Sequence, residues 1–133
     1  MLRKSRFTLA FFVWMAAVTF LSLGSFSNTD LPDIRIPSFD KVVHFGFYFG
    51  AVILGCFFVR ERTSGNYGFK KTLFIMFFVA LVYGTIIEVL QAELTTQRDG
   101  NTYDALANSI GALAGTFVIW SLFAGKRQLK WKY

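Results

Sequence analysis

Long apolar runs dominate the chain, and four of them are long enough to cross a bilayer. The hydrocarbon core is about 30 Å thick, and a helix needs roughly 17–25 apolar residues to span it. Each run holds at most one acidic or basic side chain: Phe7–Leu23, Val42–Val59, Leu73–Leu90 and Ala105–Ala124. The pattern predicts an all-α integral membrane protein, an antiparallel bundle of four helices that forms a single domain over residues 1–133.

The first run could also be read as a signal peptide, because Arg3, Lys4 and Arg6 precede it. An h-region, however, spans about 7–15 residues, and this run is longer. No clear small-x-small cleavage site follows it before Ser25. We therefore expect the first helix to be retained in the mature protein.

Composition supports the membrane assignment and excludes an ordinary soluble enzyme. Hydrophobic residues make up 54% of the chain and charged residues 17%, below the usual value of about 25%. A small water-soluble domain needs more polar surface than this. The net charge of +6 does not indicate a nucleic-acid partner, because the basic residues form clusters between apolar runs rather than a stripe along one face.

The distribution of charge predicts the orientation in the membrane. Basic residues favour the cytoplasmic side of short loops. Of the 14 basic residues, eleven fall on one side of the predicted spans: Arg3, Lys4, Arg6, Arg60, Arg62, Lys70, Lys71, Lys126, Arg127, Lys130 and Lys132. Seven of the eight acidic residues fall on the other side. Both termini are therefore predicted to be cytoplasmic.

Polar side chains collect near the outward ends of three predicted helices. The second helix has Asp40, Lys41, His44 and Tyr48, the third Glu88 and Gln91, and the fourth Asp104 and Asn108; Arg98 lies in the loop before the fourth. Spacings of three or four place most of these residues on one face of their helix. Ionisable groups inside a membrane are usually paired or functional. We expect one connected site in which Glu88 pairs with Lys41, His44 or Arg98.

Two glycine pairs are expected to bring the helices that carry these residues together. They are Gly46-x-x-x-Gly50 on the second helix and Gly111-x-x-x-Gly115 on the fourth. Small residues at this spacing allow the backbones of membrane helices to approach closely. Close backbones would bring the polar faces within hydrogen-bonding distance.

The chain resembles the VanZ-like family of small membrane proteins between about residues 40 and 115. The resemblance rests on four features: D-K-x-x-H-x-x-x-Y at 40–48, G-x-x-x-E-x-x-Q at 84–91, Arg98, and D-x-x-x-N-x-x-G-x-x-x-G at 104–115. The family takes its name from an accessory protein linked to low-level teicoplanin resistance. The resemblance implies a multi-pass protein of the bacterial plasma membrane, with a role in the cell envelope or in resistance to glycopeptides.

Two functions are compatible with the polar residues. In the first, the site binds a phosphorylated lipid head group, a lipid-linked envelope intermediate or a lipoglycopeptide, with Lys41, His44 and Arg98 as donors. In the second, it is a hydrolase or transferase for a lipid-linked phosphate or ester, with His44 or Glu88 as the base. The chain has no G-x-S-x-G, P-loop or H-E-x-x-H motif, which favours binding. A transporter is the least favoured reading, because four short helices leave little room for an alternating-access cavity.

Structural roles are the alternative for the same residues. Glu88 and Arg98 could form an ion pair that fixes the outer hairpin. Asp104 and Asn108 could cap the start of the fourth helix. Without a second histidine or a carboxylate-rich loop, the sequence predicts no metal site, and no motif indicates a cofactor.

Overall fold

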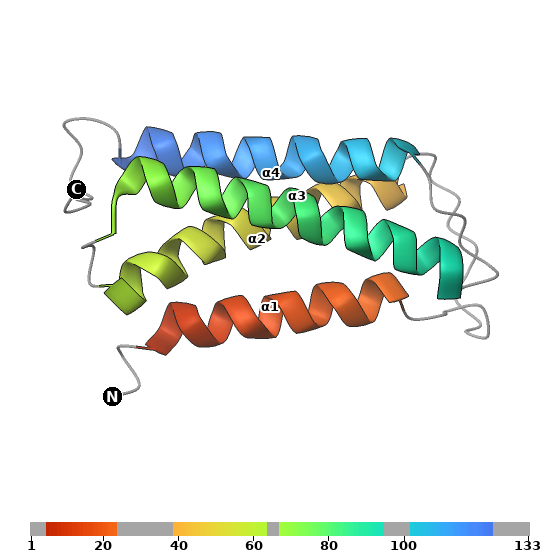
Figure 1. Ribbon diagram of the computed structural model, residues 1–133, viewed down its shortest axis with the longest axis horizontal. Coiled ribbons are helices and arrows are strands. Elements are labelled where there is room, and N and C mark those ends of the chain that lie inside the picture. The colour runs from red at the N-terminus through yellow and green to blue at the C-terminus, as the bar shows by residue number, and fades with distance from the viewer. Residues whose placement is uncertain (1–4, 24–38, 64–66, 95–101, 124–133) are drawn as a thin grey trace.

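Four helices make up most of the part of the chain that the computed structural model describes (Figure 1). This part comprises residues 5–23, 39–63, 67–94 and 102–123, with only the backbone described at 39–41, 91, 92, 94 and 102–104. The helices are α1 (Arg6–Leu23), α2 (Phe39–Thr63), α3 (Phe69–Leu94) and α4 (Thr102–Phe123). All four are long and apolar enough to cross a membrane. The predicted all-α chain with four helices of transmembrane length is confirmed.

The helices extend beyond the apolar runs that predicted them. α2 continues through Arg60, Glu61 and Arg62 to Thr63, and α3 begins at Phe69, before two lysines. Arginine, lysine and glutamate are good helix formers. Long charged side chains can also reach from a helix end into the polar region of a bilayer. The apolar runs therefore mark the inner parts of the helices.

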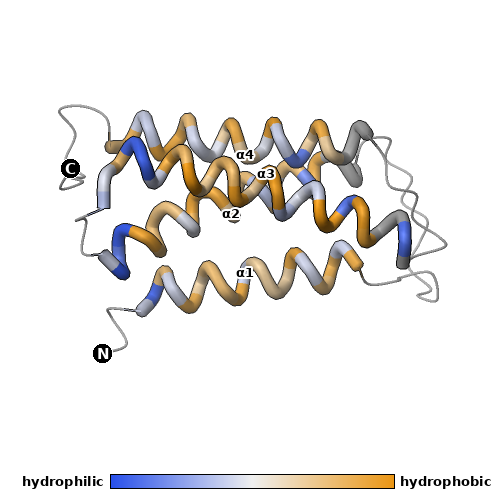
Figure 2. Tube along the Cα trace, in the orientation of Figure 1, coloured by the Kyte–Doolittle hydropathy of each residue, from blue (hydrophilic) through white to orange (hydrophobic). Residues whose placement is uncertain are grey.

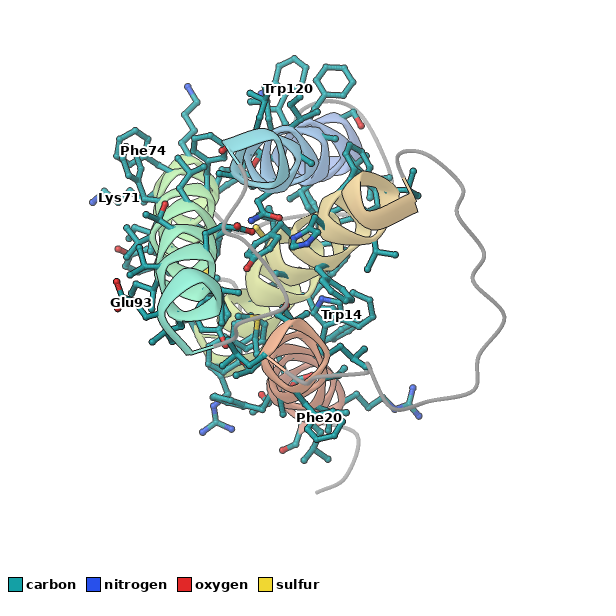
Figure 3. The ribbon with its side chains drawn as sticks, turned by 90° about the vertical axis from the view of Figure 1, so that its right-hand side faces the viewer. Trp14, Phe20, Lys71, Phe74, Glu93 and Trp120 are labelled. Carbon is teal, nitrogen blue, oxygen red and sulfur yellow. The ribbon has the colours of Figure 1, made fainter. Side chains whose placement is uncertain are left out.

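Successive helices run in opposite directions across the picture, α1 and α3 one way and α2 and α4 the other (Figure 1). Contacts between side chains connect the helices to one another at both ends of the bundle. At one end, Phe57 of α2 and Phe69 of α3 pack against Phe123 of α4. At the other end, His44 of α2 lies against Asn108 of α4. α4 contacts α2 and α3, and α1 contacts the same two helices from the opposite side (Figure 3).

Glycines on α4 allow the close contact between α2 and α4. A Cβ at Gly111 would overlap the carbonyl oxygen of Phe45, and a Cβ at Gly115 would lie 2.8 Å from that of Phe49. Backbone atoms cannot rotate away, so both positions require glycine at this helix separation. The prediction made from the second glycine pair is confirmed.

The first glycine pair does not have the predicted role. Among the described residues, a Cβ at Gly46 would meet no atom within 4 Å. At Gly50 a Cβ would lie 2.6 Å from the indole ring of Trp14, so this glycine makes room for a side chain of α1 rather than for a helix backbone. The error arose because the motif says which residues are small but not which way each one faces.

Polar contacts attach α1 to the other helices along its length. Midway, Trp14 Nε1 donates a hydrogen bond of 2.8 Å to the carbonyl oxygen of Phe47. Closer to its end, the hydroxyl groups of Thr19 and Tyr83 are hydrogen-bonded, which ties α1 to α3. Phe47 lies between His44 and Tyr48 in the sequence. The hydrogen bond from Trp14 therefore holds α1 against the part of α2 that carries these two residues.

The start of α1 is capped by a side chain from α2. Glu61 accepts hydrogen bonds from the backbone N–H groups of Phe7 and Thr8, at 3.0 and 3.1 Å, and from the hydroxyl group of Thr8 at 2.8 Å. The first N–H groups of a helix have no partner within the helix, and a carboxylate also interacts favourably with the helix dipole. Glu61 is the one acidic residue among the basic clusters, and its role is to hold α1 to α2.

Hydrophobic residues predominate along the four helices (Figure 2), and many of the large ones are exposed. Phe20, Phe74 and Trp120 point away from the bundle (Figure 3) and are 71, 65 and 49% exposed. So many exposed large apolar side chains are unusual for a soluble protein and are typical of the surface that lipid tails cover in a membrane protein.

Candidate functional site

Three polar side chains from three helices meet inside the bundle. His44 Nδ1 of α2 lies 3.0 Å from Asn108 Oδ1 of α4 and 3.7 Å from Glu88 Oε1 of α3. Asn108 Nδ2 donates a long hydrogen bond of 3.5 Å to the same Glu88 oxygen. His44, Glu88 and Asn108 are 6, 8 and 4% exposed. We refer to these three residues as the polar cluster.

The helices place the polar cluster at the end where α2 begins, α3 ends and α4 begins. Figure 3 looks at this end and shows nitrogen and oxygen atoms between these three helices. Spacing within the helices explains why the residues converge. Gly111 follows Asn108 by three residues on α4 and packs on Phe45, the neighbour of His44. The tight crossing of α2 and α4 therefore sets the short distance between His44 and Asn108.

The hydrogen bonds fix the orientation of the Asn108 amide and, through it, the hydrogen on His44. A carboxylate oxygen accepts hydrogen bonds, so Asn108 turns its N–H₂ group towards Glu88 and its oxygen towards His44. Because an amide oxygen also only accepts, His44 Nδ1 must carry a hydrogen. In the neutral imidazole the lone pair is then on Nε2. The polar cluster thus selects one tautomer of His44, which is how an orienting group prepares a histidine to act as an acceptor or base.

Tyr48 lies one turn deeper along α2, about 6 Å from His44 at 1.5 Å per residue. Its side chain is 1% exposed, and its hydroxyl group has no hydrogen-bond partner among the described residues. The ring and the Asn108 amide both lie against Gly84 of α3. A Cβ there would be 3.2 Å from the Tyr48 ring and 3.3 Å from Asn108 Nδ2. The absence of a side chain at Gly84 allows both groups to approach α3.

The other residues predicted for the site are only partly covered by the structure. The side chains of Asp40, Lys41, Gln91 and Asp104 lie outside the described part, although their backbones belong to α2, α3 and α4. Arg98 lies outside the described residues altogether. The backbone positions continue the faces of the polar cluster towards the helix ends: Asp40 precedes His44 by four residues, Gln91 follows Glu88 by three, and Asp104 precedes Asn108 by four.

The expected pairing of Glu88 with one of three basic residues is confirmed for His44. The position of Asn108 between His44 and Glu88 was not predicted. The alternative role considered for Asn108 was helix capping, which involves no residue of another helix. The contacts through which Glu61, Trp14 and Tyr83 join α1 to α2 and α3 were also not predicted. Glu61 could have been noticed as the lone acidic residue on the basic side. Within the described part of the chain, no group of three or more His, Cys, Asp or Glu residues could hold a metal ion.

Comparisons with models of known protein families, with curated proteins and with solved structures found no match for this chain.

Proposed function

We propose that the polar cluster is the inner part of a site that binds the head group of a membrane lipid or of another lipid-bearing compound of the cell envelope. The observation that carries this proposal is a buried carboxylate, imidazole and amide, joined to one another, inside a bundle whose outer surface is apolar. Such groups are costly in a membrane and mark sites more often than they serve packing alone. The resemblance to the VanZ-like family supports the same proposal, and a lipid-linked intermediate or a lipoglycopeptide is the kind of partner that it suggests.

Co-purified lipid tests the proposal. We expect wild-type protein, purified in a mild detergent, to retain a defined lipid in native mass spectra. His44→Gln keeps an N–H donor for Asn108 but removes the imidazole, and it should retain about tenfold less of this lipid, the effect of losing roughly one hydrogen bond.

The matched control is Trp120→Leu, which changes the exposed outer face and leaves the polar cluster intact. It should retain as much lipid as the wild type. Equal lipid retention by His44→Gln and the wild type would show that the polar cluster does not bind lipid.

An enzyme acting on a lipid-linked phosphate or ester is the alternative, and the orientation of His44 by Asn108 favours it. With its hydrogen on Nδ1, neutral His44 has its basic lone pair on Nε2. The same spectra test this alternative. A chemically altered lipid on the wild type that is missing from His44→Gln would support an enzyme, whereas an intact lipid supports binding.

We propose further that the helices form an antiparallel bundle in the bacterial plasma membrane, with both termini cytoplasmic and the polar cluster near the outer boundary. The described basic residues support this orientation, since Arg60, Arg62, Lys70 and Lys71 all lie where α2 ends and α3 begins. The cap from Glu61 supports it as well, because it holds the start of α1 at this same end.

Cysteine labelling tests the orientation. Glu93 lies near the end of α3 and Arg62 near the end of α2, and both are exposed. In a Cys56→Ala background, a membrane-impermeant maleimide added to intact cells should label Glu93→Cys and not Arg62→Cys. After the membrane is permeabilised, both should react. The opposite labelling pattern in intact cells would reverse the proposed orientation.

A further inference from the structure

The hydroxyl group of Tyr48 is a buried polar group that lies outside the polar cluster. Nearly all buried hydroxyl groups in proteins have a hydrogen-bond partner, because burial without one costs free energy. The cost is greater inside a membrane, where no bulk water is available. Among the described residues, none accepts from or donates to this hydroxyl group, and Tyr48 is 1% exposed.

A second donor lies beside it. The Asn108 amide nitrogen has two hydrogens, and in the described part of the chain Glu88 is the one acceptor that it reaches. The Tyr48 ring carbon that carries the hydroxyl group and Asn108 Nδ2 each lie 3.3 Å from the point where a Cβ of residue 84 would be. Two neutral donors from α2 and α4 therefore converge beside the same backbone position of α3.

We propose that the Tyr48 hydroxyl group and the Asn108 amide form a two-donor pocket for one oxygen atom of the bound lipid, either a phosphoryl oxygen or an ester carbonyl oxygen. This inference rests on the proposed function and identifies the group of the ligand that lies deepest in the bundle. Two fixed donors in a water-poor site suit an oxygen with a large partial negative charge, as in sites that stabilise oxyanions. A hydroxyl or ammonium group would bring hydrogens of its own and suits this pocket less well.

The position of the pocket fits the shape of a lipid. Tyr48 is about one helical turn, roughly 6 Å, farther from the end of α2 than His44. The outer part of a head group would meet the polar cluster, and the phosphoryl or carbonyl group that links it to the acyl chains would lie at the depth of Tyr48. The described residues just beyond Tyr48 on α2 are apolar: Ala51, Val52 and Cys56, all buried.

Tyr48→Phe tests the pocket, since it removes only the hydroxyl group. Because this group has no protein partner in the described part, the melting temperature of lipid-free protein in dodecyl maltoside should be unchanged or higher. Phosphatidylglycerol should raise the melting temperature of the wild type, and its apparent affinity for Tyr48→Phe should fall about tenfold, the effect of one hydrogen bond. Tyr67→Phe is the matched control at an exposed tyrosine outside the helices and should bind like the wild type.

Two further lipids identify the oxygen. Ether-linked phosphatidylglycerol has the phosphoryl group but no ester carbonyl, and diglucosyl diacylglycerol has the carbonyl groups but no phosphoryl group. The tenfold loss with Tyr48→Phe should appear with the ether lipid if the oxygen is phosphoryl, and with the glycolipid if it is a carbonyl oxygen.

Three results would count against the proposals. Equal affinity of Tyr48→Phe and wild type for all three lipids would overturn the two-donor pocket while leaving lipid binding in place. A lower melting temperature of lipid-free Tyr48→Phe would also overturn it, because the hydroxyl group would then have a partner within the protein or a structural water. If none of the lipids stabilised the wild type, the proposed function itself would fail.

Discussion

Gly111→Ala should destabilise the protein by about 1–3 kcal/mol, the usual cost of forcing an extra group into a packed interior. The added methyl group would overlap the carbonyl oxygen of Phe45, which belongs to the α2 backbone and cannot turn aside. α2 and α4 must therefore separate. Since His44 and Asn108 lie next to this contact, their 3.0 Å hydrogen bond should lengthen and lipid binding should weaken as well. Unfolding by sodium dodecyl sulfate in mixed micelles measures the change in stability.

The same substitution at Gly46 is a matched control. A methyl group there meets no atom of the described residues within 4 Å, so the cost of overlap is absent and the better helix propensity of alanine remains. Gly46→Ala should leave stability unchanged or raise it slightly, and lipid binding should not change. Equal stability of Gly111→Ala and Gly46→Ala would show that α2 and α4 are not in contact at Gly111.

The number and type of helices could be predicted because each apolar run has the length that a bilayer requires. Which helices are neighbours could not be predicted in the same way. In a soluble helix the polar face marks the outside, but here the outward-facing Phe20 and the buried Val18 on α1 are both apolar. The sequence therefore carries little information about the rotation of α1. Its position depends on individual contacts, such as that of Trp14 with Phe47 and Gly50.

The polar cluster was partly predictable for a related reason. Polar residues are rare in these helices, so their spacing shows which face of each helix turns inward, and this identified His44, Glu88 and Asn108 as residues of one site. The actual partners depend on how closely the helices cross. Gly111 brings α4 against α2 and makes Asn108 the bridge between the other two residues, which the spacing along any single helix does not reveal.

Removing the charge of Glu88 separates a structural role of the polar cluster from a functional one. Glu88→Gln keeps an oxygen that can accept from Asn108 but removes the negative charge. It should therefore change the free energy of unfolding by no more than about 1 kcal/mol, the net value of a typical hydrogen bond. If the charge serves ligand binding, the same variant should lose the rise in melting temperature that lipid gives to the wild type. Glu93→Gln, at an exposed position on the same helix, should change neither quantity.

His44→Ala should be far more costly, because it removes the imidazole from a buried carboxylate and leaves a cavity beside Asn108. Leaving a buried carboxylate without a partner costs about 1–3 kcal/mol or more. In the double variant with Glu88→Gln the carboxylate is gone, so the loss should be smaller than the sum of the two single losses, with a coupling of about 0.5–3 kcal/mol. Additive losses would show that His44 and Glu88 do not interact at 3.7 Å as the structure indicates. If His44 and Glu88 are coupled but Glu88→Gln still binds lipid, the pair has a structural role only. The charge would then stabilise the crossing of the helices without contributing to ligand binding.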